Sequence, residues 1–246
     1  MKRKNKKTIR VSMIEQRKIL TNSSPFAIKE AYNLVRTKLM FTTQGKKCPI
    51  YVITSSEPSE GKTTNAINLA ISFAMAGKKT LIIDADMRKP SVHKYLQLER
   101  DNGLSELLAK IEHKICLKKA QMDNLYVVTA GSIPPNPAEL IGDNVFENVL
   151  RCLVDQFDYI FIDTPPIGIV SDAALMTNYV NGYILVVRNT VSEMPCIKYA
   201  IETIQNLKGN VVGFLLNDID GKGKEYSKKG YGRYKYDYNY IYGDKK

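Results

Sequence analysis

Residues 51–64 read YVITSSEPSEGKTT, an apolar stretch that leads through a turn into Gly-Lys-Thr. We expect a buried strand, a loop and the start of a helix, the context in which backbone N–H groups surround phosphates. In such a loop the lysine reaches the β- and γ-phosphates and the following threonine ligates Mg²⁺. The pattern GxxxxGK[ST] has glycine at its first position, where this chain has Ser56. The residues that we expect to bind nucleotide here are Ser59, Glu60, Gly61, Lys62, Thr63 and Thr64.

Short apolar stretches alternate with helical patterns around this loop. They are rich in Ile, Val and Leu and lack polar alternation, which is typical of a parallel sheet buried on both faces. We therefore predict a doubly wound α/β domain of the P-loop NTPase type, with ligands at the carboxyl ends of the strands. The expected strands are 50–54, 80–83, 125–129, 159–162, 183–187 and 211–216. The expected helices are 62–76, 137–156, 172–178 and 193–207, preceded by an N-terminal helix from Pro25 to about Phe41.

Carboxylates follow two of the predicted strands, in LIIDADMR (residues 81–88) and YIFIDTPP (residues 159–166). A lone aspartate at a strand end is usually a cap or turn residue, but three of them beside a phosphate loop indicate a site. Phosphoryl transfer requires carboxylates that hold Mg²⁺ and one that meets the incoming hydroxyl. We expect Thr63, Asp86 and Asp163 at the Mg²⁺. Asp84 is expected to accept or orient the hydroxyl proton, although Asp84 and Asp86 can exchange roles.

Basic residues are concentrated at the two ends of the chain. The net charge is +11 overall, +7 for residues 1–20 and +5 for residues 221–246, which leaves −1 for the rest. Such ends suit an anionic membrane surface or an acidic partner, or they only solubilise the protein. The nearly neutral centre disfavours a nucleic-acid-binding module. The scattered cysteines and the lack of an apolar run of about 20 residues indicate a cytoplasmic chain that does not span a membrane.

Tyrosine is concentrated in residues 221–246, among Gly, Lys, Arg and Asn, without apolar partners. Packing does not explain these side chains, so the hydroxyl or the ring must be what is needed there. We predict a disordered tail that carries phosphate acceptors; the alternative is a low-complexity segment without that role. The expected acceptors are Tyr226, Tyr231, Tyr234, Tyr236, Tyr238, Tyr240 and Tyr242.

Together these features resemble a known family. SSEPSEGKT, LIIDADMR and FIDTPP resemble the Walker A, A′ and B motifs of the bacterial tyrosine kinases that control capsular and extracellular polysaccharide synthesis. GSIPPNPAEL (residues 131–140) resembles another segment typical of that family, and the tyrosine cluster completes the likeness. The resemblance extends over about residues 25–246. It is greatest to the Gram-positive form, a cytosolic kinase whose membrane-spanning activator is a separate polypeptide.

The resemblance implies an autokinase that transfers the γ-phosphate of Mg·ATP to tail tyrosines of a neighbouring copy. It implies recruitment to the inner face of the plasma membrane, a ring of unphosphorylated copies that separates on phosphorylation, and a cognate tyrosine phosphatase. It also implies that Asn217 contacts the adenine, unless this residue only ends its strand. We therefore expect the chain to consist of a basic N-terminal segment (1–24), a kinase domain (25–220) and a flexible tyrosine-rich tail (221–246).

The chain departs from the family pattern at specific positions. Ser59 replaces a usual glycine, which restricts the backbone there. The family's oligomerisation motif ExxRxxR appears as Glu30, Asn33 and Arg36, and Asn cannot make the bidentate carboxylate contact of an Arg. We therefore expect Glu30 and Arg36 to support a weaker ring; alternatively the helix is merely amphipathic. Arg88 either stabilises phosphate charge or pairs with a nearby acid.

The main alternative is a partitioning or division ATPase of the MinD/ParA type, which shares the fold and the two-aspartate motif. Those proteins carry a signature lysine five positions before the Walker lysine. This chain has Glu57 at that position, a residue of opposite charge. The tyrosine-rich tail would also be left without a role, so we favour the kinase.

Overall fold

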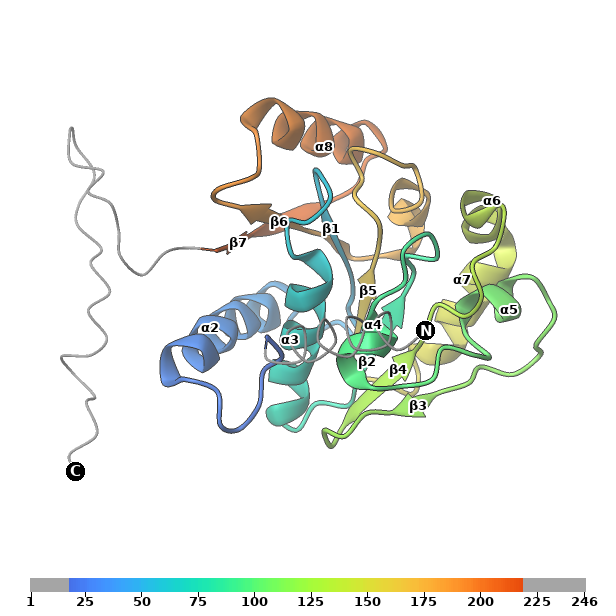
Figure 1. Cartoon of the computed structure of the whole chain (residues 1–246), viewed down its shortest axis with the longest axis horizontal. Coiled ribbons are helices and arrows are strands. Elements are labelled where there is room, and N and C mark those ends of the chain that lie inside the picture. The colour runs from blue at the N-terminus through green and yellow to red at the C-terminus, as the bar shows by residue number, and fades with distance from the viewer. Residues whose placement is uncertain (1–17, 219–246) are drawn as a thin grey trace, which may run out of the picture.

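The computed structural model describes residues 18–218, in which helices and strands alternate along the chain (Figure 1). Its seven strands form one sheet in the order β3-β4-β2-β5-β1-β6-β7. All neighbours are parallel except β3 and β4. The strands are β1 (Ile50–Ser55), β2 (Thr80–Asp84), β3 (Lys118–Lys119), β4 (Leu125–Val128), β5 (Tyr159–Asp163), β6 (Gly182–Arg188) and β7 (Val211–Asn217).

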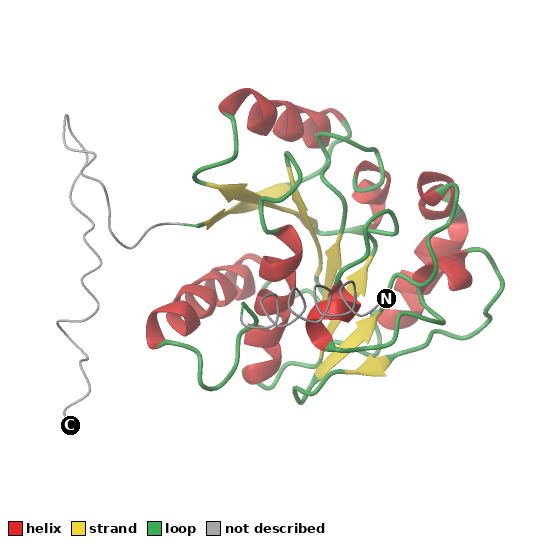
Figure 2. Cartoon of the chain, in the orientation of Figure 1, coloured by secondary structure: helices red, strands yellow, loops and turns green. Residues whose placement is uncertain are grey.

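Helices cover both faces of the sheet, which gives three layers (Figure 2). One core lies between the sheet and α2 (Phe26–Thr42), α3 (Lys62–Met75) and α4 (Val92–Leu96). The other lies between the opposite face and the helices α5 (Leu104–Leu108), α6 (Pro137–Gly142), α7 (Asn144–Leu153), α8 (Met194–Asn206) and the 3₁₀ helix η1 (Ala174–Tyr179). Every residue of β1, β2 and β5 is buried, as expected for strands covered on both faces.

The predicted doubly wound α/β fold is confirmed. The six predicted strands are present, each within a residue of its expected bounds, and α2 begins directly after Pro25. Because β2, β5 and β1 are neighbours, the phosphate loop and both acidic segments leave the same edge of the sheet. The fold therefore brings together the three segments that the sequence singled out.

Some local predictions were wrong. The single helix expected over 137–156 is two helices, because Asp143 has extended backbone angles (φ −75°, ψ 147°) and its side chain caps α7 by accepting from the Val145 N–H. The expected helix at 172–178 is the 3₁₀ helix η1. The short helices α4 and α5 and the two-residue strand β3 were not predicted, since elements this short carry little periodicity.

Of the helices within residues 18–218, none has the length and apolar character that crossing a bilayer requires. The basic segment before residue 18 and the predicted acceptor tyrosines lie outside the described residues. The boundaries expected at residues 24 and 220 therefore stay predictions.

Candidate active site

The loop between β1 and α3 has a left-handed backbone at two of its residues. Gly61, the residue before α3, has φ 92°, and Ser59 has φ 65°, both in the left-handed region. A side chain at Gly61 would collide with Asn217, because a Cβ there would lie 2.2 Å from its Nδ2. Helix α3 begins at Lys62, so its free N–H groups and positive dipole end face the loop, as in an anion site.

Glu60 and Asn217, both predicted to bind nucleotide, make hydrogen bonds that support this loop. The carboxylate of Glu60, a fully buried residue, accepts hydrogen bonds from Ser56 Oγ (2.9 Å) and the Glu57 N–H (3.0 Å). Asn217, at the end of β7, donates from Nδ2 to the Glu60 carbonyl at 2.9 Å. The Glu60 side chain is therefore turned into the loop, where it supports the backbone.

Lys62 extends from the start of α3 to the acidic residues. Its Nζ lies 2.9 Å from Asp86 Oδ2, and its side chain is 14% exposed. Burial by itself lowers the pKa of Lys62, but the charges of Asp163 and Asp86, the hydrogen bond to Asp86 and the charge of Asp84 outweigh it and raise that pKa. The Lys62 side chain is thus held in its charged form at the end of the phosphate loop.

Asp84 and Asp163 are paired across adjacent strands, since their Cα atoms are in register between β2 and β5. Both are fully buried. Burial and the charges of Asp163 and Asp86 raise the pKa of Asp84 far above its ordinary value, although backbone N–H groups of Val92 and Ser91 oppose this. Burial raises the pKa of Asp163 to about 6, against the lowering effects of Lys62 and Thr63 and with a small addition from Asp86. Lys62 alone does not balance this concentration of negative charge.

The unpartnered oxygens of these residues fit a cation. Among the described residues, neither carboxylate oxygen of Asp163 has a hydrogen bond of standard geometry, and Oδ1 of Asp84 also has none. The Thr63 hydroxyl lies close enough to Asp163 to lower the pKa of that carboxyl. It also makes a long contact of 3.3 Å with Ser91 Oγ. Within residues 18–218 no three acidic, His or Cys side chains make a metal site on their own. Mg²⁺ takes one or two carboxylates and completes its shell with water and phosphate, so the carboxylate oxygens of Asp84 and Asp163 are of the kind that it binds.

Asp84 and Asp86 differ in what already binds them. Asp84 Oδ2 accepts the N–H groups of Ser91 (3.2 Å) and Val92 (3.1 Å). Asp86 uses both oxygens, Oδ2 for Lys62 and Oδ1 for the Lys89 N–H at 2.9 Å. Of these two aspartates, only Asp84 therefore retains an oxygen without a hydrogen-bond partner within residues 18–218, a distinction that the sequence left open.

Arg88 pairs with an acid, one of the two roles that the sequence allowed. Its Nε and Nη2 donate to the two carboxylate oxygens of Asp172, each at 2.9 Å, and Asp172 is fully buried. Sequence reasoning missed Asp172 as a site residue, because SDA reads simply as the start of a helix. It also missed Tyr95, whose hydroxyl lies 3.4 Å from Thr64 Oγ1.

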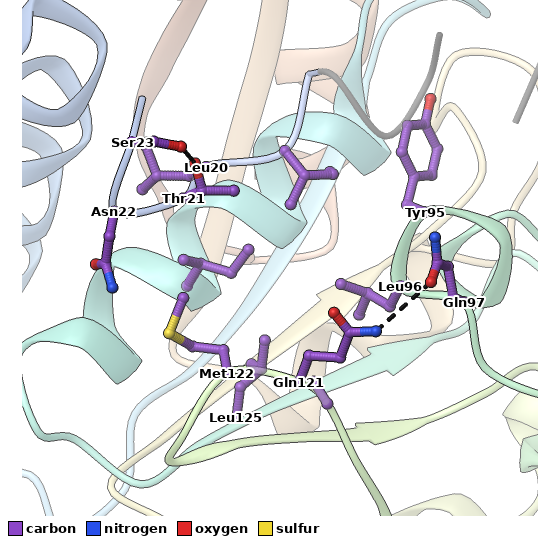
Figure 3. A pocket seen from close by; sticks show the side chains of 13 residues that line it. Leu20, Thr21, Asn22, Ser23, Tyr95, Leu96, Gln97, Gln121, Met122 and Leu125 are labelled. Carbon is purple, nitrogen blue, oxygen red and sulfur yellow. Dashed lines mark hydrogen bonds between the residues drawn. The ribbon is translucent and has the colours of Figure 1, made fainter. Parts of the chain in front are cut away.

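A cavity of about 490 Å³ lies between the segment before α2, α4 and the β3–β4 turn (Figure 3). Its lining includes Leu20, Leu96 and Met122 but no charged side chain, and no residue of the loop 56–63. It therefore lacks the groups that phosphate binding needs.

The residues 51–215 match the family model described as an AAA domain. The tyrosine-protein kinase YwqD of Bacillus subtilis is 36% identical over 222 residues, which cover 89% of this chain and 92% of YwqD. The kinase domain of the Escherichia coli tyrosine kinase ETK has a TM-score of 0.76 at 30% identity and covers 82% of this chain and 80% of that one. The chimerical protein CapA2B2 has a TM-score of 0.73 at 35% identity, over 79% and 85% of the two chains.

The division ATPase MinD is a more distant match. The MinD of Pyrococcus horikoshii, solved with Mg-ADP, has a TM-score of 0.58 at 25% identity over 69% of this chain and 70% of its own. The alternative of a MinD-type switch therefore fits the fold but matches less closely than the kinases.

The fold, the loop and the carboxylates at the ends of β2 and β5 define a P-loop nucleotide-binding protein. Its relatives are more specific than the fold. The chain belongs to the family of bacterial tyrosine-protein kinases.

Proposed function

We propose that this protein is an ATP-dependent tyrosine autokinase that phosphorylates the tyrosines of residues 221–246 in a neighbouring copy. One observation supports this proposal above the others: the phosphate loop, Lys62 and the carboxylates of Asp84, Asp86 and Asp163 come together at one edge of the sheet. The mechanism below assigns a task to each of these groups.

Phosphate binding falls to the loop and to Lys62. The left-handed backbone at Ser59 and Gly61 shapes the loop before α3, whose N-terminal N–H groups and dipole favour an anion. Lys62 supplies a point charge for the transferring phosphoryl group. In the described structure that charge is paired with Asp86, so nucleotide binding requires Lys62 to share or exchange this partner.

Metal binding falls to Thr63, Asp86 and Asp163. Mg²⁺ held by these residues would neutralise charge on the phosphates. Within residues 18–218 neither oxygen of Asp163 has a hydrogen bond of standard geometry, whereas both oxygens of Asp86 are bound, by Lys62 and by a backbone N–H. We infer that Asp163 is the more direct ligand and that Asp86 acts through water and through Lys62.

Proton acceptance falls to Asp84. Two backbone N–H groups fix its Oδ2, which leaves Oδ1 available to the hydroxyl of an incoming tyrosine. The raised pKa of Asp84 makes it a better proton acceptor than an ordinary carboxylate. In the transfer, a bond forms between the tyrosine oxygen and the γ-phosphorus, and the bond from that phosphorus to the β–γ bridging oxygen breaks. ADP is the leaving group, and the phenolic proton passes to Asp84.

The N-terminal helix is the proposed contact between copies. On α2, Asn33 accepts from Arg36 Nη1 (2.9 Å) and donates to Glu30 Oε1 (2.8 Å), so it connects the two remaining residues of the motif. Arg36 also donates to the Ser72 carbonyl of α3 at 2.7 Å. We propose a ring of unphosphorylated copies with α2 in the interface, weakened because Arg36 is engaged within its own chain.

The likeness to the CapA2B2 chimera supports a separate membrane-spanning activator, and the basic ends support recruitment to the inner face of the plasma membrane. In this proposal the kinase controls capsular or extracellular polysaccharide synthesis and export, and a cognate tyrosine phosphatase reverses the modification. Nucleic acid is not a partner. These assignments rest on family resemblance.

Mass spectrometry of the tail after incubation with Mg·ATP tests the proposed activity, with and without a co-expressed membrane partner. Phosphate should appear on tyrosines of residues 221–246 and depend on Mg²⁺. Nucleotide hydrolysis without any phosphotyrosine, under both conditions, would instead support an ATPase switch.

A further inference from the structure

Within residues 18–218, the hydrogen bonds to the buried carboxylate of Glu60 all come from uncharged groups. Its hydrogen-bond partners are the hydroxyls of Ser56 and Ser192 and the N–H of Glu57. Burying a carboxylate costs free energy unless hydrogen bonds satisfy it. A negative charge next to a phosphate site also opposes phosphate binding. The three hydrogen bonds offset part of this cost, and they connect the carboxylate to its own loop and to Ser192.

Ser192 is the one of these partners that comes from a distant part of the chain, the turn between β6 and α8. Its Oγ accepts the backbone N–H of Arg188 at 2.7 Å, so its own hydroxyl proton is directed to Oε1 of Glu60. Ser192 thus joins the end of β6 to the carboxylate inside the phosphate loop. Because a carboxylate can only accept, this hydrogen bond runs from Ser192 to Glu60 in the wild type.

The ends of β6 and β7 hold the loop at two further points. Arg188 Nη1 donates to the Ser59 carbonyl at 3.2 Å, and its Nε donates to Asp218 Oδ2 at 3.0 Å. Asn217 donates to the Glu60 carbonyl. These contacts fall on residues 59 and 60, next to the left-handed angles of Ser59 and Gly61. A serine adopts the left-handed region at a cost, so the surrounding contacts must maintain it.

We propose that Ser192 is a positioning residue for the phosphate-binding loop, which it orients through Glu60. The inference rests on the proposed function, because it concerns the same nucleotide site. Loss of the Ser192 hydroxyl leaves Oε1 of Glu60 with one fewer donor and removes one of the contacts that hold the loop to the end of β6, while the Arg188 contact with Ser59 remains. The loop then spends less time with its N–H groups turned to the phosphates, which weakens nucleotide binding before it affects the chemical step.

The test uses the full-length chain and titrates Mg·ADP by calorimetry. Ser192→Ala should weaken Mg·ADP binding about tenfold, the effect of losing one hydrogen bond to a charged acceptor. KM for ATP should rise by a similar factor while kcat for tail phosphorylation changes less than about twofold. Ser192→Thr, which keeps the hydroxyl, should restore binding to within about twofold of wild type.

Two matched variants separate positioning from general damage. Thr203→Ala removes a hydroxyl that bonds only within α8, to the Tyr199 carbonyl, and should leave Mg·ADP binding unchanged. Glu60→Gln can still accept from Glu57 and donate to the hydroxyls of Ser56 and Ser192, so it should bind Mg·ADP more tightly than Glu60→Ala.

Equal Mg·ADP affinity for wild type and Ser192→Ala would overturn the inference and leave the proposed function intact. So would a loss of affinity that Ser192→Thr does not restore, or a drop in thermal stability with unchanged affinity. If the wild type itself does not bind Mg·ADP, the proposed function and this inference both fail.

Discussion

Lys62 Nζ lies 2.9 Å from Asp86 Oδ2, so the lysine of the phosphate loop is paired with the second aspartate that follows β2. The pair connects the start of α3 to the segment that follows β2. The charge of Lys62 also lowers the pKa of Asp163, against the effect of burial. The central relationship of the site is thus electrostatic, with one ammonium among three carboxylates.

Lys62→Met should abolish tail phosphorylation while the chain stays folded. The variant loses the charge that stabilises the transferring phosphoryl group, and removal of one such group typically costs about 10²–10³ in kcat. Phosphotyrosine blotting measures the loss and circular dichroism checks the fold. Lys114→Met, which alters an exposed lysine, should retain full activity. Near-normal autophosphorylation of Lys62→Met would refute the assignment of the site.

Asp163→Asn should stabilise the metal-free protein at neutral pH. Burial raises the pKa of Asp163 from 3.8 to about 6, so the folded state binds more protons than the unfolded state between those values. Stability therefore falls as pH rises through this window, and the asparagine variant escapes that loss. The difference should reach at most about 3 kcal/mol at pH 7.

Urea unfolding at several pH values measures this difference. It should shrink as pH falls through this window and approach zero below about pH 3, where wild-type Asp163 is protonated in both states. Asp123→Asn, at a 91% exposed side chain, is the control and should show no comparable gain. A difference that is independent of pH would rule out the raised pKa as its cause.

Ser59→Gly should raise the thermal unfolding midpoint or leave it unchanged, although glycine usually destabilises. The left-handed φ of 65° costs a serine about 1–2 kcal/mol, while the extra chain entropy of glycine costs about 0.5–1 kcal/mol. Differential scanning calorimetry should show the opposite sign for Ser23→Gly, since Ser23 lacks a positive φ and loses its bond to Thr21. A clear loss of stability in Ser59→Gly would show that the serine side chain has another role.

Asn33→Arg should strengthen assembly by restoring the arginine of the oligomerisation motif. An arginine can pair bidentately with a carboxylate of a neighbouring copy, which asparagine cannot. Light scattering on the Lys62→Met background should show a larger species than Lys62→Met alone, and heavily phosphorylated wild type should be monomeric. Thr37→Arg, one turn further along α2, controls for the added charge. Equal masses for all these proteins across protein and salt concentrations would contradict assembly through α2.

Much of the fold was predictable because buried strands are continuous apolar stretches. Asp84 and Asp163 end two such strands, and the loop that contains Gly61 leaves the end of a third. Because these strands are neighbours in a parallel sheet, the three motifs lie together at one edge. The division of the helix at Asp143 was not predictable, because both halves continue the same apolar periodicity. The cap that the Asp143 side chain makes with the Val145 N–H decided that boundary.

The supports of the site were harder to see than the site itself. Ser192 and Asp172 are ordinary polar residues in sequence, and only the fold places them against Glu60 and Arg88. Glu60 was expected to contact nucleotide, but its carboxylate is bound inside the loop. Sequence patterns identify residues that carry chemistry more readily than those that orient them.

Transfer between copies is the central claim, and a mixing experiment tests it most directly. An active chain truncated after Asp220 is incubated with full-length Lys62→Met and radiolabelled Mg·ATP, and the two are separated by size. The label should appear on tail tyrosines of the inactive full-length chain, because only the truncated chain has Lys62 and only the inactive one has acceptors. An unlabelled full-length chain, or strong tyrosine labelling of the truncated chain, would contradict the account.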